Sequence, residues 1–183
     1  MRRTKNIIIV VTSLLMSAIF LIAASAVNSH NPVGHLLPNY NLLPNHDKKQ
    51  IECLAENILF EAGSEPREGQ VAVAMVTMNR LNAGGQFGNS VCSVVQQKTK
   101  STCQFSWWCD KNLQNKAVND KYNQEMYSKA KEVAMLVYIN YDNMKDNTHG
   151  SLYYHADYVN PRWKGMQQTT KIGRHIFYKP INI

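Results

Sequence analysis

Apolar residues recur at helical spacing along three stretches of the chain. In the first, residues 51–62, they follow the i, i+3, i+4 rhythm of a helix that buries one face. Asp47 has the spacing of a capping-box start, and Gly63 is a stop signal. Pro66 suits the first turn of a second helix, whose apolar positions repeat the same spacing through residues 71–78. The pattern predicts two amphipathic helices joined by a short turn.

A third helix is predicted over residues 119–141, where apolar side chains form a continuous stripe. After the turn-rich residues 147–150 the pattern changes, and residues 151–156 and 175–178 have the aromatic and β-branched composition of strands. We expect these two strands to pair across the loop at residues 160–163. The predicted fold class is α+β, a mainly helical domain with a small antiparallel sheet.

The N-terminus has the features of an export signal. Arg2, Arg3 and Lys5 precede an uncharged apolar run over residues 7–27. The small residues at its end fit a secretory cleavage site after Ala26, but the run is also long enough for an uncleaved membrane anchor. Residues 1–27 are therefore predicted to be a signal peptide or signal anchor, and the remainder is predicted to lie in the periplasm or cell envelope.

The rest of the chain divides into a linker and one domain. Residues 28–47 contain three prolines and little periodicity, which is typical of a linker, and residues 48–183 have the size of a single domain. Removing residues 1–26 would lower the formal charge from +7 to +4. A modest positive charge suits an anionic polymer such as a cell wall, and no basic stripe with interleaved aromatics predicts nucleic acid as a partner.

Four cysteines lie in the part predicted to be exported, where oxidation is expected. They are Cys53, Cys92, Cys103 and Cys109. Two disulfides are predicted, and the sequence leaves all three pairings open. The spacing lacks the paired C-x-x-C motifs of a zinc site, so neither a metal nor another cofactor is predicted. Residues 98–116 are predicted to form a loop held by such disulfides, with aromatics that either stack on sugar rings or cover the core.

The turn between the first two helices is rich in carboxylates. Glu61 falls in the last turn of the first helix, beside the apolar stripe, where the helix dipole and partial burial both raise a carboxyl pKa. Glu65 and Glu68 stand at the positive end of the next helix, which favours their ionisation. Opposed environments of this kind separate acid and base roles at one pH. The structural alternative is a solvated Glu61 and two capping charges.

Several separated blocks follow one another in a fixed order between residues 53 and 178. They are Glu61-Ala-Gly-Ser-Glu65-Pro, Gly69-Gln-Val-Ala-Val-Ala74 with Asn79-Arg80, Cys103-Gln-Phe-Ser-Trp107, Tyr154-His-Ala156, Trp163, and Ile172-Gly-Arg-His175 with Phe177-Tyr178. In these blocks the chain resembles the SleB-type cell-wall hydrolases, the family of spore-cortex-lytic enzymes. The usual Glu-Ala-Arg-Gly-Glu of that family reads Glu-Ala-Gly-Ser-Glu here, so both flanking glutamates are kept while the residues between them differ.

The resemblance implies a lysozyme-like fold that cleaves peptidoglycan between N-acetylmuramic acid and N-acetylglucosamine, with Glu61 as the general acid. A lytic transglycosylase needs no second catalytic carboxylate, because the 6-hydroxyl of the muramic residue attacks its own C1. A muramidase-type hydrolase would need one, and Glu65 is the nearest candidate. The family favours the transglycosylase, and the sequence leaves hydrolysis open.

Other polar and aromatic residues are candidates for binding the glycan strand. Equally, the histidines are candidates for structural roles in the sheet, and the amides for bracing the turn. The substrate-binding candidates are Glu65, Gln70, Gln104, Ser106, Tyr153, His155, Trp163 and His175.

Two functions of other classes are alternatives. A zinc peptidase or amidase would be built on His149, His155, Asp157 and His175, although no HExxH-like pair at helical spacing supports it. A non-catalytic wall-binding protein would need no acid at all. The predicted partners are therefore peptidoglycan strands and, if the N-terminal segment stays uncleaved, the membrane.

Overall fold

A computed structural model describes residues 37–114 and 121–181, and within them the chain from Pro38 onward forms one compact unit. The predicted signal segment and residues 28–36 of the predicted linker lie outside the described residues. No helix in that described part combines the length and the apolar character that crossing a membrane requires.

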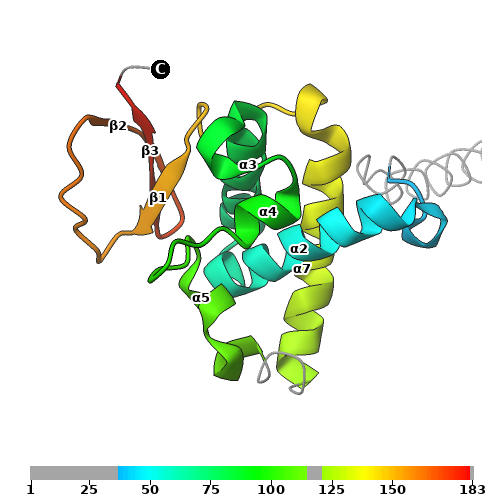
Figure 1. Cartoon of the computed structure of the whole chain (residues 1–183). Coiled ribbons are helices and arrows are strands. Elements are labelled where there is room, and N and C mark those ends of the chain that lie inside the picture. Colours follow the sequence, from blue (N-terminus) through cyan, green and yellow to red (C-terminus); the bar gives the residue numbers. More distant parts are fainter. Residues whose placement is uncertain (1–36, 115–120, 182–183) are drawn as a thin grey trace, which may run out of the picture. The chain divides into compact units, whose positions relative to one another are not determined.

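The three predicted helices are present. They are α2 (Asn45–Ala62), α3 (Arg67–Ala83) and α7 (Lys121–Asn140). The shorter elements are η1 (Tyr40–Leu42), η2 (Gly85–Phe87), α4 (Val91–Val95), α5 (Ser106–Cys109) and η3 (Tyr141–Asn143). The central helix is α3, which lies between the sheet on one side and α2 and α7 on the other (Figure 1). Because it is surrounded, α3 is buried over most of its circumference rather than on a single stripe.

The start of α2 differs from the prediction. The helix begins at Asn45 after Pro44, and no side chain caps it. Asp47 lies inside the first turn and does not cap; its Oδ1 accepts a hydrogen bond of 2.9 Å from the Tyr138 hydroxyl. The Asp47 carboxylate, which the local pattern assigned to capping, is therefore used in a tertiary hydrogen bond with α7. With η1 just before it, helical structure begins within the range that was predicted as linker.

The sheet contains the two predicted strands and a third that was not predicted. The strands β1 (Tyr153–Ala156), β2 (Met166–Ile172) and β3 (His175–Pro180) are antiparallel in the order β1-β3-β2. The predicted pairing is confirmed, with Tyr154 opposite Phe177. The missed strand is the edge strand β2, whose mostly polar sequence Met-Gln-Gln-Thr-Thr-Lys-Ile lacks the apolar alternation of a buried strand. The fold class α+β, mainly helical with a small antiparallel sheet, is confirmed.

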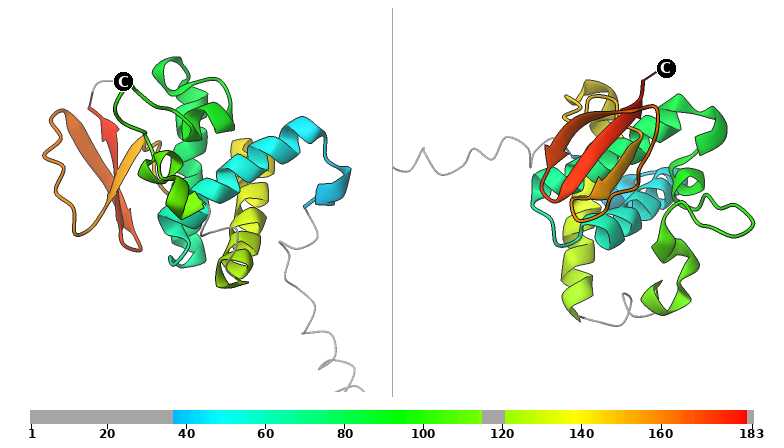
Figure 2. Two further views of the ribbon diagram at one scale, coloured as in Figure 1. Left: turned by 60° about the horizontal axis from the view of Figure 1, so that its bottom comes forward. Right: turned by 90° about the vertical axis from the view of Figure 1, so that its left-hand side faces the viewer.

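The inner face of the sheet packs on α3. Phe177 is fully buried against Ala72 and Val76, and Tyr154 and Ile172 pack around this cluster. On the outer face, Tyr153 packs edge-on against Phe87 of η2 with ring centres 6.1 Å apart. In the right-hand view of Figure 2 the sheet lies in front of the helices. The two faces of one small sheet therefore have different surroundings.

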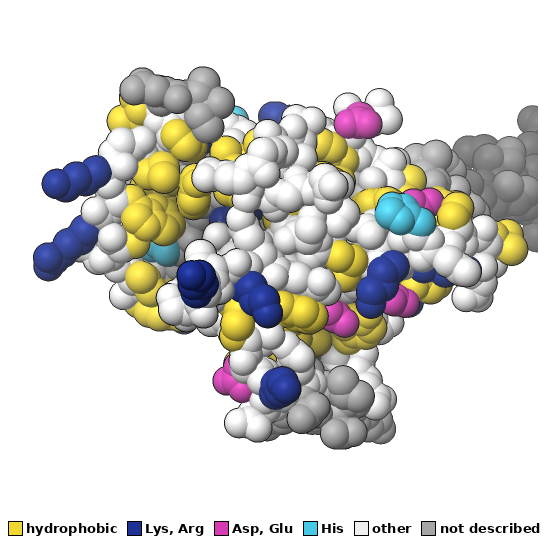
Figure 3. All heavy atoms as spheres, in the orientation of Figure 1, with side chains coloured by type: hydrophobic (Ala, Val, Ile, Leu, Met, Phe, Trp, Pro, Cys, Tyr) yellow, Lys and Arg dark blue, Asp and Glu magenta, His cyan; other side chains and the backbone are white. Residues whose placement is uncertain are grey.

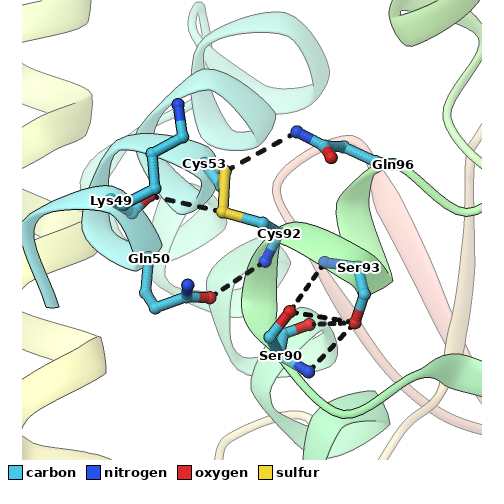
Figure 4. Close-up of a disulfide and its surroundings, with 7 residues drawn as sticks. All are labelled: Lys49, Gln50, Cys53, Ser90, Cys92, Ser93 and Gln96. Atoms are coloured by element: carbon cyan, nitrogen blue, oxygen red, sulfur yellow. Dashed lines mark hydrogen bonds between the residues drawn. A yellow bond between two sulfur atoms is a disulfide. The ribbon is translucent and has the colours of Figure 1, made fainter. Parts of the chain in front are cut away.

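Both predicted disulfides form, in one of the three possible pairings. Cys53 is bonded to Cys92 and ties α2 to α4, and Gln50 Oε1 accepts a 3.1 Å hydrogen bond from the Cys92 backbone N–H in the same region (Figure 4). Cys103 is bonded to Cys109 and closes a short loop that ends in α5. The first bond anchors α4 to α2, whereas the second joins α5 to the loop that precedes it.

Candidate active site

The turn between α2 and α3 is held from inside by Gln70. This buried side chain donates from Nε2 to the backbone oxygens of Gly63, at 3.4 Å, and Glu65, at 3.2 Å. Gly63 caps the C-terminal end of α2, where carbonyls lack helical partners, and Glu65 lies in the turn that follows. Of the two roles open to Gln70, the contacts are those of a residue that braces the turn.

Glu61 lies one residue before the end of α2, as predicted, and is partly buried. It faces the inner side of the sheet, because its Oε2 accepts a hydrogen bond of 3.3 Å from the hydroxyl of Tyr154 in β1. The contact joins residues 93 positions apart in the sequence. The carboxyl therefore stands where the helical part meets the sheet, and not in open solvent.

The surroundings of Glu61 favour its protonated form. Burial raises the pKa of Glu61 above the ordinary value of a glutamate, because the charged form loses hydration. The hydrogen bond from Tyr154 and the positive charge of Arg80 lower that pKa, but they do not cancel the effect of burial. Burial likewise raises the pKa of the Tyr154 hydroxyl well above its usual range, so Tyr154 remains a donor. The predicted direction for Glu61 is present, with burial as its main cause.

Arg80 is a buried cation close to this carboxyl. Its side chain in α3 is 2% exposed, and its Nε donates to the Leu152 backbone oxygen at 2.7 Å. The guanidinium carbon lies 5.3 Å from the ring centre of Phe105 and 5.6 Å from that of Tyr153. Burial lowers the pKa of Arg80, while the nearby Glu61 charge opposes that change. The aromatic rings and the backbone oxygen replace the water that a buried cation loses.

The loop closed by Cys103–Cys109 reaches the same cation. When the Gln104 amide is turned so that its oxygen faces Arg80, it accepts from Nη1 and Nη2, each at 3.2 Å. Gln104 also lines a cavity of about 310 Å³ at the base of this loop. Ser106 is the exposed first residue of α5. The two residues predicted from this loop thus lie at the surface, and Gln104 connects that surface to Arg80.

The aromatics of the loop have a different role. Trp107 is 3% exposed, stacks on Phe60 with ring centres 4.5 Å apart, and donates from Nε1 to the buried Asn57 Oδ1 at 3.3 Å. Trp107 therefore covers the core at the end of α2. This is one of the two alternatives that the sequence left open for the aromatics of this loop. This packing holds the last turn of α2, which carries Glu61.

The outer face of the sheet carries a cluster of four aromatic rings, which we call the outer aromatic cluster: Tyr153, His155, Trp163 and Tyr178. The ring centre of Trp163 lies 5.9 Å from that of Tyr153 and 5.6 Å from those of His155 and Tyr178. Trp163 is 40% exposed, so part of its ring faces solvent. In Figure 3 hydrophobic side chains gather over the sheet, and Lys and Arg side chains project beside them.

The two predicted histidines have different surroundings. His155 is satisfied on both ring nitrogens, since Nδ1 lies 2.8 Å from the Ala156 backbone oxygen and Nε2 lies 3.1 Å from the Tyr178 hydroxyl. His175 is buried against the ring of Tyr154, and its Nδ1 has no hydrogen-bond partner among the described residues. Burial lowers the pKa of His175, which Glu65 and Asp157 oppose. His155 thus has the contacts of a structural histidine, whereas the Nδ1 of His175 is buried and has no partner among the described residues.

Two residues of the site were not among the predicted site residues. Tyr154 and Arg80 were named only as parts of sequence blocks. The alternation of Tyr153, Tyr154 and His155 on a short strand could have revealed that Tyr154 faces the side opposite to its neighbours. Nothing local in the sequence indicates that Arg80 would be buried, because arginines on helices are usually solvated.

The zinc alternative has no ligand set in this structure. Over residues 37–114 and 121–181, no three His, Cys, Asp or Glu side chains gather closely enough to hold a metal ion. The four residues proposed for that alternative do not converge.

The sequence itself places this chain in a known class of proteins. The profile of the Cell Wall Hydrolase family matches residues 64–178, which is more than half of the chain. The chain therefore belongs to the cell wall hydrolase family, and its relatives are of the SleB type. The spore cortex-lytic enzyme of Bacillus subtilis (strain 168) is 32% identical over 139 residues, which are 75% of this chain and 40% of that protein. The spore cortex-lytic enzyme of Oceanobacillus iheyensis is 32% identical over 146 residues, which are 78% of this chain and 46% of that protein.

Among solved structures, the catalytic domain of the germination-specific lytic transglycosylase SleB from Bacillus anthracis is 28% identical, with a TM-score of 0.47 over 76% of this chain and 98% of that chain. The catalytic domain of the Bacillus cereus SleB protein is 26% identical with the same TM-score, over 75% of this chain and 95% of that chain. This chain spans less than half the length of the curated relatives that it matches. The family match begins at residue 64, so Glu61 lies three residues before it and its role rests on the site itself.

Proposed function

We propose that this chain is a peptidoglycan-degrading enzyme that cleaves the bond between N-acetylmuramic acid and N-acetylglucosamine, with Glu61 as the general acid. The observation that carries this proposal is a carboxyl whose pKa is raised by burial, between the end of a helix and a sheet, in a chain of the cell wall hydrolase family. Breaking a glycosidic bond needs a proton donor beside the leaving oxygen. Tyr154 supports this role, because its hydroxyl orients the carboxyl.

The reaction proposed is that of a lytic transglycosylase. Glu61 gives its proton to the glycosidic oxygen as the bond between that oxygen and C1 breaks, and the N-acetylglucosamine leaves with a free 4-hydroxyl. The 6-hydroxyl oxygen of the muramic residue then bonds to C1, and its proton passes to the Glu61 carboxylate. The product is a 1,6-anhydro end, no water is consumed, and the acid is restored. A single carboxyl can serve both steps.

Substrate contacts are proposed at two places. Trp163 and Tyr153 of the outer aromatic cluster would stack on sugar rings, with His155 fixing the ring of Tyr178 beside them. Gln104 and Ser106, at the surface of the α5 loop, would bind polar groups of the strand. The Nδ1 of His175 is unpaired but buried, so its contacts support a place beside Tyr154 rather than direct contact with the strand. Gln70 would act indirectly, through the turn that it braces.

The site of action proposed is the cell envelope, on peptidoglycan strands as partner. Export depends on the N-terminal segment, which lies outside the described residues, so both cleavage after Ala26 and membrane anchoring stay predictions. N-terminal sequencing of the mature protein distinguishes them. A mature chain that begins at Val27 would support the signal peptide, and an intact Met1 would support the anchor.

Mass spectrometry of sacculi digested with the protein tests the proposal. We expect anhydro-muramic products from the parent and a loss of about 10²- to 10⁴-fold in Glu61→Gln, which is the usual contribution of a general acid. Glu68→Gln is the matched control, because Glu68 is an exposed carboxylate in the first turn of α3. Products with reducing ends would replace the transglycosylase by a hydrolase. Full activity in Glu61→Gln would remove Glu61 from the mechanism, and sacculus binding without any products would favour a wall-binding protein.

A further inference from the structure

Glu65 makes a contact that joins the two parts of the site. Its Oε2 accepts a hydrogen bond of 3.1 Å from the backbone N–H of Arg174, in the turn between β2 and β3. The two residues are 109 positions apart in the sequence. The turn that follows Glu61 is thereby connected directly to the hairpin, through a carboxylate that was predicted to bind substrate or to serve as a second catalytic group.

Two glycines leave the space that this contact needs. A Cβ at Gly173 would lie 2.0 Å from Glu65 Oε2, and a Cβ at Gly69 would lie 3.0 Å from Glu65 Cβ. Gly173 also has a φ of +57°, which disfavours any residue with a side chain. Gly165 has a similar φ of +69°, but no atom lies within 4 Å of the position of its Cβ. Gly173 and Gly165 share a positive φ, but only Gly173 lies against the Glu65 carboxylate. A side chain at position 173 would therefore clash with Glu65 in addition to straining the backbone.

The hairpin held by Glu65 carries the groups around the acid. His175 follows Arg174 directly, and its ring packs edge-on against Tyr154 with centres 5.2 Å apart. Tyr154 in turn donates to Glu61. A continuous series of contacts thus runs from Glu65 through the hairpin to Tyr154 and back to the end of α2. A shift of the hairpin would move the donor that faces the catalytic carboxyl.

We propose that Glu65 is a positioning residue, whose hydrogen bond to the β2–β3 turn sets Tyr154 and His175 in place beside Glu61. The inference rests on the proposed function, since it concerns the geometry of the same acid. One oxygen of the Glu65 carboxylate accepts the hydrogen bond from the Arg174 backbone N–H, which is the contact that a positioning residue needs. Glu65 takes no part in bond making or breaking.

The chemistry of the contact distinguishes this role from catalysis. A glutamine at position 65 keeps an oxygen that accepts from the Arg174 N–H, whereas alanine removes the acceptor. A catalytic carboxylate would lose its function in both variants, because an amide neither attacks C1 nor takes a proton there. A positioning residue is therefore rescued by the conservative variant.

The test measures release of muropeptides from sacculi against pH for Glu65→Gln, Glu65→Ala and Glu61→Gln in the full chain. We expect Glu65→Gln to stay within about threefold of the parent with an unchanged pH profile. Glu65→Ala should lose roughly 10- to 100-fold in kcat, which is the effect of a misplaced group. The pH profile of this variant should also shift, because the hydrogen bond from Tyr154 to Glu61 weakens. Loss of activity in Glu65→Gln equal to that in Glu61→Gln, with a parent-like thermal melt, would overturn the proposal, and so would parent-like activity in Glu65→Ala.

Gly173→Ala gives a second, independent measurement, with Gly165→Ala as the control for backbone strain. We expect Gly173→Ala to lose several-fold more activity than Gly165→Ala. In a Glu65→Ala background the extra loss should disappear, because the added Cβ then meets no carboxylate. Equal effects in the two backgrounds would overturn the contact as the cause. If Glu61→Gln stays active, the proposed function fails; if it is inactive while Glu65→Gln is also inactive, only the present inference fails.

Discussion

The two faces of the sheet have different surroundings, and they differ in the chemistry they can support. The inner face is largely buried: Phe177 packs on α3 with the partly buried Tyr154 beside it, and the Tyr154 hydroxyl donates to a carboxyl whose pKa is raised by burial. The outer face carries a partly exposed Trp163 among other rings, of which Tyr153 also packs on Phe87. Proton transfer benefits from low hydration, whereas stacking on a sugar needs an accessible ring. We therefore expect variants of the inner face to alter rate and pH dependence, and variants of the outer face to alter binding.

The largest effect is expected at Arg80, which packs beside Tyr153 of the outer face and whose charge acts on Glu61. Arg80→Met should lower the free energy of unfolding by about 2 kcal/mol, because it removes the charged donor to the buried Leu152 oxygen. It should also raise the pKa of Glu61, since the Arg80 charge lowers it. Denaturant unfolding and a pH profile measure the two effects. Arg174→Met is the control, because its exposed ion pair with Asp157 is expected to contribute under 1 kcal/mol. Equal destabilisation by both variants would contradict the role of burial.

Next comes Tyr154→Phe, which keeps the ring and removes the hydroxyl. Its hydrogen bond lowers the pKa of Glu61, so its loss should raise that pKa. A general acid works while it is protonated, and the alkaline limb of the activity profile should therefore move to higher pH. We expect kcat at the optimum to fall by about tenfold, within the range for a misplaced group. An unchanged alkaline limb would show that Tyr154 does not act on Glu61.

Trp163→Ala tests the outer face. We expect binding of the Glu61→Gln protein to sacculi to weaken about fivefold, corresponding to roughly 1 kcal/mol of buried apolar area. The alkaline limb of an active Trp163→Ala protein should stay where it is in the parent. Tyr158→Ala is the control, because Tyr158 is 77% exposed in the same loop and lies beside Arg174, outside the outer aromatic cluster. A changed pH profile in Trp163→Ala would mean that the two faces are not separate.

The smallest effect concerns the stability of Glu61→Gln. The pKa of Glu61 is raised in the fold, so the folded chain binds this proton more tightly than the unfolded chain does. That stabilisation is complete below the unfolded pKa of about 4.3 and is lost as pH rises through the folded pKa. Glutamine does not ionise, so Glu61→Gln should be more stable than the parent at pH 7 by about 1 kcal/mol. Thermal melts at pH 7 and pH 3.5 should show a difference only at the higher pH.

The sequence determined those features that depend on neighbours along the chain. Helical periodicity placed three helices, and the last turn of α2 placed Glu61 at a helix end beside the apolar stripe. The strand-like composition of residues 151–156 and 175–178 predicted the two strands that pair as β1 and β3. Residue identities in several blocks were enough to point to the family.

Tertiary structure decided which distant side chains share a surrounding. Local pattern did not reveal β2, because an edge strand against β3 needs few apolar residues of its own. The local pattern left the cysteine pairing open. It also assigned Asp47 to a helix cap, whereas in the structure Asp47 accepts a hydrogen bond from Tyr138 of α7. The burial of Arg80 and the reach of Glu65 to Arg174 come from packing between segments far apart in sequence. Hydration and hydrogen bonding, which set a carboxyl's pKa, depend on those distant neighbours, so periodicity located Glu61 while the folded structure determined how it is held.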